Sequence, residues 1–103
     1  MVVVSKKQSF GLELKNKVRH YKLLSQKALE IVELNALLSE EQERIAQDFL
    51  QMARNYFNDA KHFEEKGDLL TALAAFSYAH AWLDAGVRAR LFKASDSKLF
   101  TLP

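Results

Sequence analysis

The chain lacks cysteine altogether and contains only three glycines and one proline, which is the last residue. Without cysteine there can be no disulfide, no thiolate metal site and no cysteine nucleophile, and the composition fits a reducing cytoplasm. No proline interrupts a helix before the end of the chain. No apolar run approaches the roughly 18–20 residues that cross a bilayer, and the apolar start, residues 1–4, is too short for a signal-peptide core. We therefore expect a cytoplasmic protein that contains a few long helices and does not bind to a membrane.

The length and charge of the chain are those of one ordinary globular domain. It has 103 residues, of which 49% are hydrophobic and 27% are charged, and its formal net charge is +2. A chain of this size buries enough surface for one modest core. The net charge is too small to predict a nucleic-acid partner by itself.

Apolar residues recur at helical spacing in three stretches, which predict helices over residues 9–33, 40–66 and 69–92. The inner stripe predicted for the first consists of Leu14, Val18, Tyr21, Leu24, Ala28, Ile31 and Val32. That of the second consists of Ile45, Phe49, Met52, Ala53, Tyr56, Ala60 and Phe63. That of the third consists of Leu69, Ala72, Leu73, Phe76, Ala79, Leu83, Val87 and Leu91.

Local signals mark most of the predicted helix ends. Ser9 suits the start of the first helix, and Ser39 followed by Gln42 is typical of a capping box. Gly67 and Asp68 indicate a tight turn between antiparallel second and third helices. The fold class predicted is all-α, an up-down-up three-helix bundle that forms a single domain over residues 1–103. A short extended tail, residues 93–103, would pack back through Leu99, Phe100 and Leu102.

The third predicted helix has no ordinary polar face. Its outward arc consists of Ala74, Tyr78, Ala81, Trp82, Ala85 and Ala89. A helix that is apolar all round is normally covered all round. Either the tip of the tail or a second chain should therefore cover the Trp82 side, and Tyr78, Trp82 and Phe100 are the candidate interface residues. Gly86, in the middle of this helix, suggests a close approach of another segment or a bend.

Few residues suggest chemistry. His80 and Asp84 are four residues apart, and we expect them to form a buried polar cluster with Tyr56. A metal site that combines His80 with Asp59 and His62 is the alternative. No nucleotide-binding, metalloprotease or nucleophile-elbow motif is present, so we expect no enzymatic activity and no cofactor.

Charge is unevenly distributed between the first two helices. Residues 6–33 carry seven basic and three acidic side chains, and residues 39–66 carry four basic and seven acidic ones. The simpler interpretation is that the two helices attract each other. The alternative is that Lys15, Arg19 and Lys22, which share a face of the first helix, contact RNA or DNA.

The second and third helices resemble a known family. The similarity lies in residues 56–63, 65–68 and 72–88, and its most specific part is YAHAWLDAG at residues 78–86. This sequence resembles the small archaeal family called domain of unknown function 357, while the first helix matches it only in general character. The resemblance implies a compact three-helix bundle from an archaeal cytoplasm, and it supplies no activity and no functional residues. The leading hypothesis is a non-enzymatic module for protein interaction or self-association, and a nucleic-acid accessory protein is the alternative.

Overall fold

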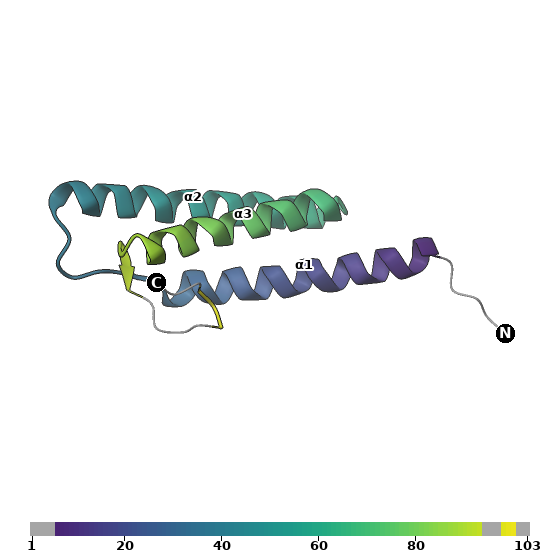
Figure 1. The fold of residues 1–103 in the computed structure, drawn as a ribbon. Helices are drawn as coiled ribbons and strands as arrows, with labels where there is room; N and C mark the ends of the chain where they lie inside the picture. Colours follow the sequence, from purple (N-terminus) through teal and green to yellow (C-terminus); the bar gives the residue numbers. More distant parts are fainter. Residues whose placement is uncertain (1–5, 94–97, 101–103) are drawn as a thin grey trace.

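The computed structural model describes residues 6–93 and 98–100, and these form three helices joined by short connections (Figure 1). The order of elements is α1 (Lys6–Ile31), β1 (Glu33–Leu34), α2 (Glu40–Glu65), α3 (Leu69–Arg88) and β2 (Phe92–Lys93). Helices α1 and α3 run in the same direction and α2 runs opposite to both (Figure 1). The all-α, three-helix fold predicted from the sequence is therefore confirmed.

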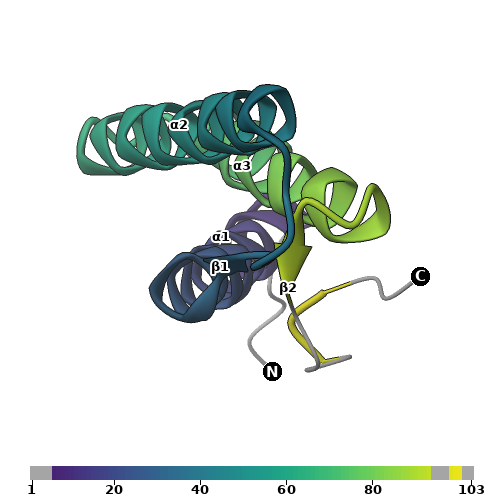
Figure 2. The ribbon, with the colours of Figure 1, turned by 90° about the vertical axis from the view of Figure 1, so that its left-hand side faces the viewer.

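Helix α3 is the central helix of the molecule. It packs extensively on α2 and also on α1, whereas α1 and α2 contact each other only sparsely (Figure 2). A helix with neighbours on two sides has little surface left for polar residues. This arrangement explains why α3 is apolar on the sides that face α1 and α2, but it leaves the apolar arc that contains Tyr78 exposed.

The local signals around α2 act as the sequence predicts. The Ser39 hydroxyl accepts a hydrogen bond from the Gln42 amide at 3.1 Å, and the Gln42 side chain accepts one from the Ser39 amide at 2.9 Å. At the other end, Gly67 has a φ of 80° and the amide of Asp68 donates to the carbonyl of Phe63. A left-handed glycine with this bond is the Schellman ending of a helix. The Asp68 carboxylate then accepts from the Thr71 amide and caps α3.

The prediction that the third helix continues to residue 92 is wrong. Helix α3 ends at Arg88, and Arg90 takes a left-handed conformation with a φ of 61°. The amides of Arg90 and Leu91 donate to the carbonyls of Val87 and Gly86, so this end is a second Schellman motif. Sequence signals did not reveal it, because arginine is an unusual residue at a left-handed position.

The first helix also differs from its predicted bounds, since α1 begins at Lys6 rather than Ser9 and ends at Ile31 rather than Glu33. It ends there because Glu33 and Leu34 belong to β1, which pairs antiparallel with β2. Glu33 lies opposite Lys93 and Leu34 opposite Phe92. This two-stranded pairing closes one end of the bundle.

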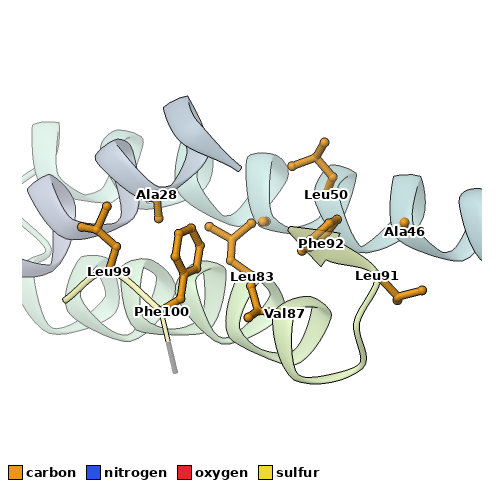
Figure 3. Packing of buried hydrophobic residues seen from close by; sticks show 10 residues of the cluster. Ala28, Ala46, Leu50, Leu83, Val87, Leu91, Phe92, Leu99 and Phe100 are labelled. Carbon is orange, nitrogen blue, oxygen red and sulfur yellow. The ribbon is translucent and has the colours of Figure 1, made fainter. Parts of the chain in front are cut away.

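The core consists of two clusters of buried side chains. One lies toward the α2–α3 turn and contains Val18, Phe57, Ala60, Ala72, Phe76 and Ala79. The other lies at the strand end and contains Ala28, Ala46, Leu50, Ala53, Leu83, Val87, Leu91, Phe92, Leu99 and Phe100 (Figure 3). The predicted return of the tail is thus seen for Leu99 and Phe100, and Leu102 lies outside the described residues.

The predicted inner stripe of α2 is rotated from the observed one. The buried row of α2 is Ala46, Leu50, Ala53, Phe57 and Ala60, whereas Ile45 is 42% exposed. Of the other residues predicted to be inside, Phe49, Met52, Tyr56 and Phe63 are half-buried. On α1, Ile31 is likewise exposed. The rotation follows from packing: small alanines and flat rings let α2 approach α3 closely, which leaves a second apolar row at the flank.

Candidate interaction surface

Four aromatic rings form a continuous row across the flank of α2 and α3. Phe49 and Tyr56 come from α2, two turns apart, and Tyr78 and Trp82 come from α3, one turn apart. Ring centroids are separated by 5.1 Å between Phe49 and Trp82, 6.1 Å between Trp82 and Tyr78, and 4.4 Å between Tyr78 and Tyr56. All three contacts are edge-to-face, which is a favourable geometry for aromatic pairs.

A shallow apolar groove runs on both sides of Tyr78, whose side chain is 47% exposed. On one side is a hollow of about 300 Å³ lined by Tyr56, Asp59, Phe63, Thr71, Ala74, Ala75 and Tyr78. On the other is a hollow of about 220 Å³ lined by Tyr78, Ala81, Trp82 and Ala85. We call these two hollows together the α2–α3 groove. The alanines keep it open because they leave space where larger side chains would fill it.

Trp82 contacts α2 through the ring of Phe49, and its other ring contact is with Tyr78 on α3; among the described residues, the Phe100 ring stacks on His80 instead. The indole is half-buried at the edge of the core, and its Nε1 is buried without an acceptor among the described residues. Trp82 therefore packs against the core and also lines the groove.

Phe100, the third candidate interface residue, does not belong to this surface. It is only 3% exposed and stacks on His80 with 6.3 Å between the ring centroids. His80 and Tyr78 are two residues apart, which places them about 200° apart around the helix. Phe100 therefore covers the opposite side of α3, where it is part of the core.

The predicted polar cluster is only partly present. His80 is 8% exposed, and its Nε2 lies 3.7 Å from an Asp84 carboxylate oxygen, so these two residues do pair. Tyr56 is not part of this pair, because its ring contacts Tyr78 on the other side of α3. Within residues 6–93 and 98–100, no three His, Asp or Glu side chains gather as a metal site would require.

The basic face of α1 is partly neutralised by α2. The Lys22 ammonium lies 2.7 Å from a Glu64 carboxylate oxygen. Lys15 and Arg19 are exposed. Among the described residues, the opposite charges of the first two helices thus meet in the Lys22–Glu64 ion pair across the sparse α1–α2 contact.

The sequence did not show that Phe49 and Tyr56 join the surface made by Tyr78 and Trp82. Both were assigned to the inner stripe of the second helix. The width of that stripe was the one sign that some of its residues would lie outside the core. Its residues span more of the helix than one neighbour can cover. Which of its rows becomes core depends on how α2 is rotated against α3.

The fold and the groove together define a small helical domain with an apolar surface across two antiparallel helices. Among the described residues, no helix has the length and apolarity needed to cross a membrane. A family model described as "Protein of unknown function (DUF357)" matches residues 20–92, which is most of the chain, and the chain belongs to this family. No curated protein and no solved structure matches it.

Proposed function

We propose that this chain is a non-enzymatic protein-interaction module and that its contact surface is the α2–α3 groove. The observation that carries the proposal is the aromatic row, with the half-exposed Tyr78 at its centre between two apolar hollows. Tyrosine and tryptophan dominate the binding energy of many protein interfaces. The rings of Tyr56 and Trp82 also hold Tyr78 in place, so that little side-chain entropy is lost when a partner binds.

The lining of the groove indicates the chemistry of the partner. All the side chains that line it are apolar or aromatic except Asp59 and Thr71, both in the larger hollow. A partner helix that presents an apolar stripe, with a lysine or arginine placed to meet Asp59, would match both the shape and the charge. The lack of cysteine and the family resemblance support an archaeal cytoplasm as the location of this module.

The alternative function, nucleic-acid binding through α1, has weaker support. Lys22 is engaged by Glu64, which leaves Lys15 and Arg19 as the exposed members of the proposed basic face. Two such charges release few counterions. Binding to RNA or DNA that falls steeply with salt and is lost on reversing Lys15 and Arg19 would favour this alternative.

The proposal is tested by selecting displayed helical peptides against the whole protein and measuring their binding by calorimetry. We expect the selected peptides to be amphipathic with a basic residue, and Tyr78→Ser to weaken them by roughly tenfold or more. Leu23→Ser is the matched control, since Leu23 is 55% exposed on α1, away from the groove. Peptides that bind the Tyr78→Ser protein as tightly as the wild type would refute the proposal.

A further inference from the structure

The N-terminal end of α1 extends past the end of the other two helices (Figure 1). Leu14 is the first residue of α1 recorded in contact with the core. The residues before it, Lys6–Glu13, form a projection that we call the α1 overhang, and at 1.5 Å per residue it is about 12 Å long. The overhang and the α2–α3 turn, residues 66–68, together form a step at this end of the molecule.

The apolar stripe of α1 continues onto the overhang, where the described residues offer it no cover. Phe10 precedes Leu14 and Val18 at intervals of four residues and so lies on the same face of the helix. Val18 is only 1% exposed, whereas Phe10 is 57% exposed. Within the part of the chain that the structure describes, a phenylalanine in the register of the core stripe is thus left largely exposed.

The two sides of the step carry opposite electrostatic character. The overhang is the N-terminus of a helix, the positive end of its dipole, and it has no acidic residue in its first turn. At the α2–α3 turn the C-terminus of α2 meets the N-terminus of α3, so the two dipole ends oppose each other there. Residues 64–68 carry three acidic side chains, of which Glu64 pairs with Lys22, and one lysine, so this side of the step is acidic through its side chains.

We propose that a second copy of this chain occupies the step. A two-fold rotation about an axis near Phe10 places the two overhangs antiparallel, with their Phe10 faces in contact. The same rotation brings the N-terminus of each α1 toward the α2–α3 turn of the other copy. The two copies would then share one isologous interface. It would bury the apolar Phe10 face of each copy and bring the oppositely charged ends together. This surface is separate from the α2–α3 groove.

The test compares two charge substitutions on the same helix by sedimentation equilibrium over a wide range of protein concentrations. Phe10→Glu should weaken the dimer by roughly tenfold or more, because the two glutamates would face each other at the two-fold axis. Leu12→Glu is the matched control. Leu12 is 64% exposed on the same helix but lies about 200° away from Phe10, so the dimer should persist. Circular dichroism establishes that both variants keep their helices.

A second measurement uses the fact that the chain has no cysteine of its own. A single Phe10→Cys substitution should form an intermolecular disulfide quickly on mild oxidation, since the two-fold axis brings the two thiols together, and Leu12→Cys should not. A wild-type protein that is monomeric at every concentration, or a dimer equally sensitive at both positions, would overturn the proposal. Tyr78→Ser should leave the dimer unchanged and Phe10→Glu should leave peptide binding unchanged, so the two proposals can fail separately.

Discussion

The ring of Phe92 lies directly against Gly86, so closely that a Cβ at residue 86 would come within 2.2 Å of two of its ring atoms. Gly86 is buried in α3, where a glycine costs about 1 kcal/mol relative to alanine. The Schellman ending at Arg90 reverses the chain and β2 carries Phe92 back over the helix. The close approach that Gly86 suggested in the sequence is therefore made by the ring of Phe92.

This contact predicts that Gly86→Ala destabilises the protein despite its better helix propensity. The added methyl group must displace the Phe92 ring, and overpacking of this kind costs about 1–3 kcal/mol. Urea denaturation followed by circular dichroism measures the change in the free energy of unfolding. In the Phe92→Ala background the same substitution should be neutral or stabilise by up to about 1 kcal/mol. An equal cost in both backgrounds would show that the ring is not the obstacle.

The two Schellman endings both favour glycine at their left-handed position, so adding a glycine at one and removing it at the other should change stability in opposite directions. Arg90→Gly should stabilise the protein by about 0.5–1 kcal/mol, because a left-handed conformation strains a residue with a Cβ. The Asn35 side chain donates to the backbone carbonyl of residue 90, which the substitution keeps. Gly67→Ala should destabilise by about 1 kcal/mol for the converse reason. Thermal unfolding of the two variants checks the pair, and a loss of stability in Arg90→Gly would contradict it.

Short-range signals in the sequence predict some of the helix ends of this fold. Ser39 with Gln42 and Gly67 with Asp68 are short-range signals, and the structure has the capping box and the turn that they predict. The end of α3 could not be found this way, because arginine at residue 90 is not a stop signal. The pairing of β1 with β2 joins segments about sixty residues apart, which no local pattern encodes.

The candidate surface was predictable only in its α3 half. The outward position of Tyr78 and Trp82 follows from helical spacing, and the unusual apolarity of this helix drew attention to it. That α2 supplies Phe49 and Tyr56 depends on the rotation between two packed helices, which periodicity does not fix. The prediction that Phe100 joins Tyr78 and Trp82 was wrong for a related reason. The side of α3 that Phe100 covers depends on the path of the chain after Arg88, which helical spacing does not predict.

The indole of Trp82 provides a prediction about a buried polar atom. Its Nε1 is buried with no acceptor among the described residues, and such a group costs about 1–3 kcal/mol. Trp82→Phe removes this unpaired donor together with some apolar contact, so the net loss of stability should be below about 1 kcal/mol. Trp82→Ala should cost about 3 kcal/mol because it also removes the contact with Phe49. Equal losses for the two variants in chemical denaturation would show that the indole nitrogen has a partner.

The ion pair between Lys22 and Glu64 should contribute little to stability. The two side chains are 33% and 27% exposed, so water screens their attraction. A double-mutant cycle with Lys22→Met and Glu64→Gln should give a coupling below about 1 kcal/mol, and this coupling should shrink as salt is added. A larger coupling that does not respond to salt would mean that the pair is effectively buried and holds α1 against α2.

Ser25 lies in the contact between α1 and α3. Its side chain is fully buried, and its hydroxyl donates a hydrogen bond to the Phe76 carbonyl at 3.2 Å. Ser25→Ala keeps the small size but loses this bond, and it should cost about 1 kcal/mol. Ser25→Leu should cost about 2–3 kcal/mol, since the larger side chain forces the two helices apart. Denaturation experiments on both variants separate the contribution of the hydrogen bond from the cost of a larger side chain. If leucine is tolerated as well as alanine, α1 can move away from α3 at little cost.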